Sequence, residues 1–298
     1  RWGEAEQAFR QAVDGLREGA GNLGSNAAAA GVGAPLLCRL LAIHAYTLHL
    51  RNQNERALSV AAEAIAMAPQ SGAMDGLSAA EMLCGIVLAL TGSPLAARPH
   101  VERALALCRQ HHQDYHGEML RDVWWSCEHL LTQICLTLGE LAEADRHIHC
   151  ALELCQGWGK RHGEAGCLYF LGERAFHARD YEKASAYYEQ LTQLALNLGD
   201  LGTLDMLAQL RLGETRRMLG DYGQARNLLE RAGANLEEIG SFYELRALAC
   251  LARLDLYLGD AAGAWQRRSK SEARRAGPER CAGWCLSLLK QTLLALQR

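Results

Sequence analysis

The chain has 298 residues, of which 49% are hydrophobic, 22% are charged and only 6% are aromatic. This composition is typical of a folded chain and too apolar for intrinsic disorder. The formal net charge is −3, which excludes an overall basic field able to hold nucleic acid or an anionic membrane. Abundant Ala and Leu with few aromatic residues favours packed helices over a β-sheet.

No apolar run reaches the roughly 20 residues needed to span a bilayer, and no targeting segment is recognisable. The cysteine count of eleven is odd, and residues such as Cys84, Cys135 and Cys250 fall where a helix places a small apolar side chain. A secreted disulfide scaffold is normally short, with an even number of cysteines. We therefore expect reduced thiols, no bound metal and a cytoplasmic location. Because the chain opens on Arg1 rather than Met, we also expect a piece of a longer protein.

A repeat of about 40 residues dominates the sequence, in which a turn is followed five residues later by alanine. These turn alanines are Ala8, Ala57, Ala97, Ala144, Ala184, Ala225 and Ala264. A fixed period of this length is typical of stacked supersecondary units. The hydrophobic spacing predicts two helices in each unit, as in residues 204–219 and 222–239.

The Leu-Gly-Asp sequences at residues 219–221 and 258–260 are typical of the turn between such helices. Glycine adopts the left-handed conformation that ends the first helix. Aspartate accepts hydrogen bonds from the free N–H groups at the start of the second helix and suits its positive end. We therefore predict a glycine C-cap followed by an aspartate N-cap at these turns.

Twelve residues before six of the seven turn alanines the chain carries a small residue, where two closely packed helices favour short side chains. These crossing positions are Ala45, Gly85, Thr132, Gly172, Gly213 and Ala252. In this register the chain resembles tetratricopeptide-repeat (TPR) proteins. The resemblance implies an all-α fold, a right-handed superhelical solenoid of about seven helix-turn-helix (TPR-like) repeats plus a terminal helix. An irregular helical bundle is the alternative, although a bundle has no reason to keep the period.

Several segments depart from the regular repeat inside the single solenoid domain expected over residues 1–298. Residues 19–35 carry five glycines around an Ala run, which predicts a flexible loop or a weak helix broken by glycine. Pro99 predicts that one second helix starts late or is kinked. Residues 281–298 are expected to form a terminal capping helix.

Three clusters could carry chemistry, and each also has a purely structural explanation. The His and Asp residues within 111–116 could bind a metal, but a polar loop explains them equally well. The basic run at residues 267–280 could contact phosphate or an acidic partner, or it could be a solvated helix face. Trp124 and Trp125 point to different sides of a helix, so one is expected in the core and the other is a candidate groove anchor. No nucleotide-binding or catalytic motif occurs, so we expect no enzyme activity and no cofactor.

The long period and the Leu-Gly-Asp turns are similar to the TPR arrays of bacterial signal-transduction ATPases and MalT-like transcriptional activators. This resemblance implies a non-catalytic regulatory module, a sensor or docking region, whose ATPase and DNA-binding activities lie elsewhere. Its ligand would be a protein or peptide partner or a small polar inducer, with no nucleic acid or membrane contact. A multi-protein assembly scaffold without a sensing role is the alternative, and an enzyme is a third.

In TPR arrays the first helix of each pair lines the concave groove. The register carries that row onto Arg39, Tyr46, His49, Met82, Ile86, Ser126, His129, Gln133, Tyr169, Glu173, His177, Glu214, Arg217, Arg246, Arg253 and Tyr257. Recurring polar and aromatic residues suit an extended peptide or a polar ligand, although solvent-facing helix positions are polar in any case. Three arginines close together near the C-terminal end predict that the partner presents a carboxylate or another anion there.

Overall fold

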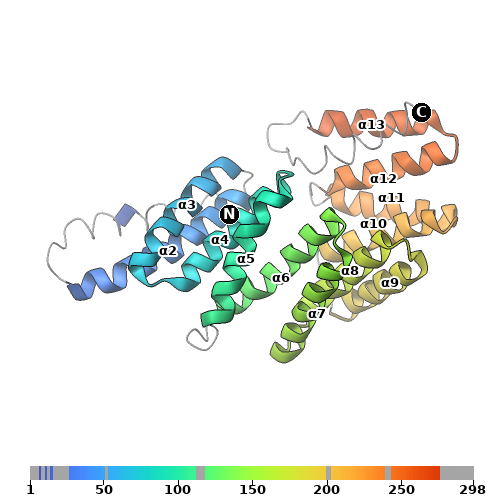
Figure 1. Cartoon of the computed structure of the whole chain (residues 1–298). Coiled ribbons are helices and arrows are strands. Elements are labelled where there is room, and N and C mark those ends of the chain that lie inside the picture. The colour runs from blue at the N-terminus through green and yellow to red at the C-terminus, as the bar shows by residue number, and fades with distance from the viewer. Residues whose placement is uncertain are drawn as a thin grey trace. The chain divides into compact units, whose positions relative to one another are not determined.

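A computed structural model describes residues 27–50, 53–111, 118–198, 203–238 and 243–275, with the isolated positions 7, 11, 14 and 15. Within these ranges the chain forms α-helices joined by short turns and contains no β-strand (Figure 1). In chain order the helices are α2 (Ala27–Leu50), α3 (Asn54–Ser71), α4 (Met74–Leu90), α5 (Pro94–His111), α6 (Glu118–Leu138), α7 (Leu141–Trp158), α8 (Arg161–His177), α9 (Tyr181–Leu198), α10 (Thr203–Met218), α11 (Tyr222–Glu238), α12 (Glu244–Tyr257) and α13 (Ala261–Arg275). The predicted all-α repeat fold is confirmed.

The helices follow the repeat register. Six of the seven expected helix pairs fall within the described residues: α2–α3, α4–α5, α6–α7, α8–α9, α10–α11 and α12–α13. In each of these pairs the turn alanine, from Ala57 to Ala264, is buried. The pair expected around Ala8 and the terminal helix expected at 281–298 lie outside the described residues.

The two Leu-Gly-Asp turns have the predicted caps. Gly220 and Gly259 adopt φ angles of +85° and +81°. Asp221 accepts a hydrogen bond at 3.1 Å from the backbone N–H three residues on, and Asp260 accepts the equivalent bond at 2.8 Å. In the α8–α9 turn the left-handed position is held by Arg179, with a φ of +63°. The backbone geometry is therefore conserved from turn to turn even where glycine is absent.

The crossing positions explain why the repeat needs small residues. A Cβ atom added to Gly213 would lie 2.8 Å from Cγ of Leu229, and one added to Gly172 would collide with the ring of Tyr188. In both cases the partner comes from the second helix of the same pair, sixteen residues later. Each glycine therefore provides the space into which the facing side chain packs.

The chain divides into two compact units, Arg1–Ile134 and Cys135–Arg298, with the boundary inside α6. We refer to them as the first and second unit. The prediction of a single solenoid domain over residues 1–298, with its right-handed superhelix, stays a prediction.

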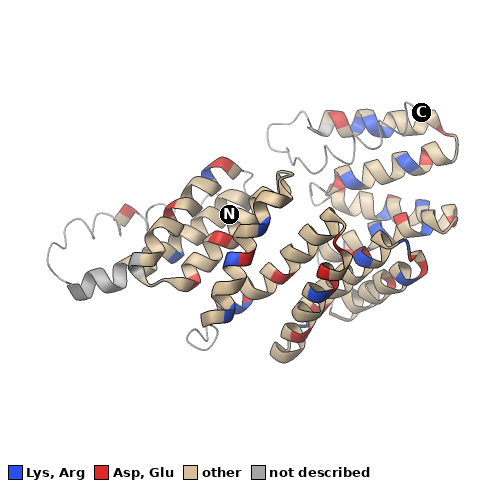
Figure 2. Cartoon of the chain, viewed as in Figure 1, with Lys and Arg blue, Asp and Glu red and all other residues tan. Residues whose placement is uncertain are grey.

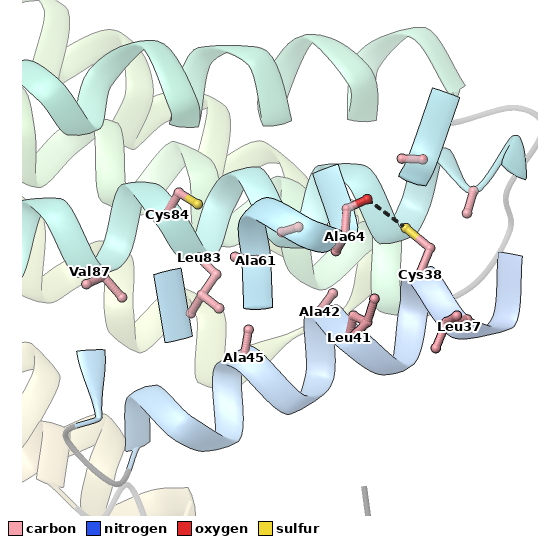
Figure 3. Close-up of a cluster of buried hydrophobic side chains, with 13 residues drawn as sticks. Leu37, Cys38, Leu41, Ala42, Ala45, Ala61, Ala64, Leu83, Cys84 and Val87 are labelled. Carbon is pink, nitrogen blue, oxygen red and sulfur yellow. Dashed lines mark hydrogen bonds between the residues drawn. The ribbon is translucent and has the colours of Figure 1, made fainter. Parts of the chain in front are cut away.

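The core of the first unit shows how small side chains bring helices together. Ala45 on α2, Ala61 on α3 and Leu83 on α4 belong to one buried cluster (Figure 3). The Cys38 thiol in the same cluster donates a hydrogen bond at 3.4 Å to the carbonyl of Ala64. Cysteine here acts as a small apolar residue with a weak donor, as its sequence position predicts.

Two predictions about irregular segments are corrected. Residues 19–35 do not form a loop throughout, because α2 begins at Ala27 and residues 27–35 are helical, while residues 19–26 lie outside the described part. Of the two alternatives for Pro99, a late start of the helix is wrong, since α5 begins at Pro94 and continues through Pro99, while a kink at Pro99 stays a prediction. Pro94 is the first residue of α5, where a proline lacks only an N–H that would find no partner inside the helix. Among the described helices, none is both long and apolar enough to cross a membrane.

Candidate functional site: an arginine cluster in the second unit

The predicted binding row divides between the two units, and in the first unit its N-terminal members contact near neighbours. Arg39 pairs with Asp75 on α4, with 2.7 Å between Nε and Oδ2. Nδ1 of His49 lies 3.0 Å from Oδ1 of Asn54. Tyr46 is exposed, and its ring centroid lies 6.5 Å from that of His49. These contacts fix individual side chains on α2 without gathering them into a cluster.

Further along the first unit the predicted members are half-buried; they are Met82, Ile86, Ser126, His129 and Gln133. The ring centroid of Trp125 lies 4.0 Å from that of His129, and burial lowers the pKa of His129 to about 3. Trp124 donates its indole N–H to Oε1 of Glu128 at 3.3 Å. Both tryptophans are half-buried, so neither lies fully in the core as expected for one of them, and a role of the other as a groove anchor stays a prediction.

The second unit brings six predicted residues into one network; they are Tyr169, Glu173, Glu214, Arg217, Arg246 and Arg253. Glu173 on α8, Glu214 on α10 and Arg253 on α12 share one repeat position, eleven residues before the turn alanine. These three residues therefore occupy equivalent places on the first helices of successive repeats. Figure 2 shows acidic and basic positions together on α10 and α12.

Glu214 is a centre of this network. Its Oε2 accepts a hydrogen bond from Nη1 of Arg211 at 2.6 Å, and its Oε1 accepts one from Nη1 of Arg253 at 2.6 Å. Nη2 of Arg217 lies 4.0 Å from the same Oε1. Burial alone would raise the pKa of Glu214, but the charges of Arg211 and Arg253 outweigh burial and lower it to about 2. Glu214 is therefore ionised at neutral pH.

Glu173 is the second centre. Tyr188 donates its hydroxyl to Oε1 of Glu173 at 2.6 Å, and Arg211 also pairs with this oxygen. Nη2 of Arg246 lies 3.9 Å from Oε2, while Nη1 of Arg246 donates to the hydroxyl of Tyr169 at 3.4 Å. Burial opposes ionisation, but Arg211 and Arg246 lower the pKa of Glu173 below its ordinary value. Arg211 thus joins the two carboxylates into one network.

We call this network the arginine cluster; its members are Arg211, Arg217, Arg246, Arg253, Glu173 and Glu214. Guanidinium groups stay protonated in proteins, so four cations and two carboxylates give a formal charge of +2. His177 adds no charge, because burial lowers the pKa of its imidazole. A local positive excess within a chain of net charge −3 is suited to binding an anion.

Sequence reasoning missed two residues of this site. Arg211 lies fourteen residues before its turn alanine, where other repeats have packing residues such as Leu83 and Leu130. Its guanidinium carbon lies 4.2 Å from the ring centroid of Phe176. The isolated arginine between two leucines was a signal that could have revealed it. Tyr188 gave no such signal, because the register already explains it as the residue that packs on a crossing glycine.

The described part of the basic run is engaged in ion pairs. Nε of Arg267 lies 2.6 Å from Oδ2 of the buried Asp255. Nε of Arg268 lies 3.0 Å from Oε1 of Glu272, and Lys270 lies 2.9 Å from Glu237 on α11. These pairs support the structural explanation of this segment.

The candidate metal ligands remain largely outside the structural description. His111 ends α5, and residues 112–117 are not among the described ones. In the part of the chain that the structure describes, no three His, Cys, Asp or Glu side chains gather in a way that could hold a metal ion.

No protein-family model matches the sequence, and no curated protein matches it. Solved structures do match the fold. The Rap protein complexed with Competence and Sporulation Factor is 15% identical, with a TM-score of 0.62 over 91% of this chain and 74% of that chain. A tetratricopeptide repeat protein from Parabacteroides merdae is 13% identical, with a TM-score of 0.59 over 96% of this chain and 92% of that one.

A third similar structure is a signal transduction ATPase with numerous domains (STAND) from Pyrococcus horikoshii, which has a tetratricopeptide repeat sensor. It is 13% identical, with a TM-score of 0.53, and the match covers 91% of this chain but only 40% of the larger protein. At such identities the likeness concerns the fold, and function has to be argued from the site.

Proposed function

We propose that this chain, which has the tetratricopeptide-like repeat fold of those structures, is a non-catalytic binding module for a protein or peptide partner. The observation that carries the proposal is the arginine cluster, built from the first helices of three successive repeats. A partner with acidic side chains or a free carboxylate would complement its positive excess. Charge complementarity of this kind mainly provides specificity and fast association.

The cluster has an inner and an outer part. The side chains of Arg211 and Arg246 are only 6% exposed, whereas those of Arg217 and Arg253 are 15% and 23% exposed. A partner would therefore contact the outer pair, and the inner pair would set the local charge. Each guanidinium offers a planar set of donors that matches a carboxylate through two parallel hydrogen bonds.

The proposal also covers the kind of larger protein in which this module acts. The long repeats and the likeness to the STAND sensor support a regulatory region of a bacterial signalling ATPase or transcriptional regulator, acting in the cytoplasm. A small polar inducer is the other ligand class suited to the cluster. Nucleic acid is not proposed as a ligand, because the excess charge is confined to a few side chains instead of spreading along a basic stripe.

The test compares two synthetic eight-residue peptides that differ only in charge, one with an Asp-Glu-Asp centre and the other with Asn-Gln-Asn. We expect the acidic peptide to bind the full chain at least tenfold more tightly by isothermal titration calorimetry, with an affinity that falls as salt rises. Arg217→Gln should abolish this preference, and Lys183→Gln, an exposed change on α9, should not. Equal binding of the two peptides would overturn the proposal.

The variants are chosen so that the protein stays folded. Replacing Arg253 or Arg246 removes a cation from a buried carboxylate, which is strongly destabilising. Arg226 on α11 is unsuitable as a control for the same reason, since its Nη2 lies 2.8 Å from the buried Asp255. Arg217 makes only a 4.0 Å contact with Glu214, so its removal leaves the short ion pairs intact.

A further inference from the structure

Next to the outer arginines, large apolar side chains are exposed where α10 and α12 end. Tyr257 is 65% exposed, and Leu258 and Met218 are exposed as well. The ring centroids of Tyr257 and Tyr222 lie 5.2 Å apart at an interplanar angle of 42°. Isolated exposed apolar residues need no explanation, but a group that includes paired aromatic rings is typical of a binding surface.

The outer arginines are neighbours of this group. Arg253 and Tyr257 are four residues apart on α12 and therefore share a helix face. Nη2 of Arg217 lies 3.1 Å from Sδ of Met218, which is a weak acceptor. Nε of Arg217 is buried and has no hydrogen-bond partner. The guanidinium of Arg217 therefore has donors for which the protein supplies no strong acceptor.

We propose that this aromatic rim, consisting of Arg217, Met218, Tyr222, Arg253 and Tyr257, binds a phosphoryl group carried on an aromatic ring, as in a phosphotyrosyl side chain of a partner protein. The inference rests on the proposed function, because it names the group by which the partner is recognised at the same site. The phosphoryl oxygens would accept hydrogen bonds from Arg217 and Arg253. The ring would pack against Tyr257 and Met218.

Charge and shape together favour this ligand over a single carboxylate. A phosphate monoester carries a charge of about −1.5 to −2 at pH 7 and three acceptor oxygens, which matches the formal +2 of the arginine cluster. A carboxylate supplies one negative charge and no ring. The exposed tyrosine pair and the methionine sulfur both make favourable contacts with an aromatic face.

The second unit contains a matched site that should not bind. The guanidinium carbon of Arg268 lies 5.1 Å from the ring centroid of Trp265, whose side chain is also exposed. Nε of Arg268, however, lies 3.0 Å from Oε1 of Glu272. Here too a cation lies beside an exposed ring, but a carboxylate of the same helix already neutralises it. Arg268→Gln is therefore the control for Arg217→Gln.

The experiment titrates the full chain with three small probes by isothermal titration calorimetry. Phenyl phosphate has the ring and two charges, methyl phosphate lacks the ring, and phenyl sulfate has the ring but one charge. We expect phenyl phosphate to bind at least tenfold more tightly than either of the others. Its affinity should fall between pH 7.5 and pH 5, since the second pKa of a phosphate monoester is about 6.

The variants separate the two parts of the rim. Arg217→Gln should lower the affinity for both phosphates at least tenfold. Tyr257→Ala should lower the affinity for phenyl phosphate to that for methyl phosphate. Arg268→Gln should change neither. Circular dichroism checks that each variant is folded; if Arg217→Gln unfolds, Arg217→Lys, which keeps the charge but loses the paired donors, should still weaken phenyl phosphate.

A last titration tests whether the phosphoryl group can come from a peptide. It compares one eight-residue peptide in two forms, with tyrosine and with phosphotyrosine. We expect only the phosphorylated form to bind. If phenyl sulfate binds as well as phenyl phosphate, if Tyr257→Ala keeps the preference, or if the phosphopeptide does not bind, this inference is wrong. The proposed function would still stand in that case, provided that the acidic peptide binds. Failure of the acidic peptide and of all phosphates would overturn both.

Discussion

The two units stabilise buried carboxylates in different ways. In the first unit Glu81 on α4 pairs with Arg103, with 2.9 Å between Oε1 and Nε, and Glu128 on α6 pairs with Arg109 at 3.0 Å. Both arginines come from the second helix α5, and both side chains are 52% exposed. Each acid therefore has its own arginine, and each arginine extends towards solvent.

In the arginine cluster of the second unit, by contrast, the acids and the arginines come from the first helices. Glu173 on α8 and Glu214 on α10 pair with Arg211 on α10, and Glu214 also pairs with Arg253 on α12. Because all partners lie on one helix row, their charges accumulate in one place. The comparison shows that the same repeat fold gives isolated ion pairs where the arginines come from a second helix, as with Arg103 and Arg109, and a charged site where several arginines share one row of first helices.

Removing the central arginine of each unit should make this difference measurable. We expect Arg211→Met to destabilise the second unit by about 3–5 kcal/mol, because it leaves two buried carboxylates without their shared cation. Arg103→Met in the first unit should cost only about 1 kcal/mol, since the Arg103 side chain is half-exposed and His100 still contacts Glu81 after its removal. Hydrogen exchange of α8–α12 and of α4–α5, followed by mass spectrometry, measures the two effects separately.

Similar losses in both units would contradict the comparison. Leu207→Ala, a buried apolar change on α10 outside the network, is the control for general destabilisation. It should lower the stability of the second unit and leave the ionisation of the arginine cluster unchanged.

Acid should also destabilise the second unit. The pKa of Glu214 is lowered to about 2 from an ordinary value of 4.5, so its ionised form contributes stability that is fully present above about pH 4.5. This contribution is lost as the pH falls towards 2, and by linkage it amounts to at most about 3 kcal/mol. Urea titrations between pH 6 and pH 3 should show a falling free energy of unfolding, with a smaller slope for Glu214→Gln. Identical slopes for the two proteins would show that Glu214 is not the titrating group.

The repeat could be predicted from the sequence because its signals are local and steric. A left-handed turn requires Gly220 or its equivalent, and a close helix crossing requires Gly213, whatever the rest of the chain does. The charge network was predicted only in part. Glu173, Glu214 and Arg253 follow from the register, but the contacts of Arg211 depend on side-chain distances between helices of different repeats. In the segment 27–35, the helix propensity of the alanine run outweighed the glycines.

The crossing glycines are a feature that both units share, so substitutions there should have similar effects. Gly213→Leu is expected to cost on the order of 1–3 kcal/mol, because the new side chain meets Leu229. Gly85→Leu in the first unit should cost a similar amount, since Val101 occupies the equivalent space. The control is Gly223→Ala in the first turn of α11, where an added Cβ meets nothing, so stability should change by no more than about 0.5 kcal/mol. Unfolding by urea measures all three, and a neutral Gly213→Leu would show that α10 and α11 can separate without cost.

The smallest effect concerns the α8–α9 turn, where an arginine holds the left-handed position. Arg179 in the second unit has a φ of +63°, whereas the equivalent Gly92 in the first unit has a φ of +89°. A left-handed conformation costs a residue with a Cβ about 1–2 kcal/mol, and glycine avoids this cost but loses about 0.5–1 kcal/mol of conformational entropy on folding. Arg179→Gly should therefore stabilise the second unit by about 0.5–1 kcal/mol in urea unfolding, and Gly92→Ala should destabilise the first unit by a similar amount. Arg179→Ala separates the two contributions, because it removes the long side chain but keeps the Cβ and should change stability little. If Arg179→Ala stabilised as much as Arg179→Gly, the gain would come from losing the arginine side chain and not from relieving the backbone.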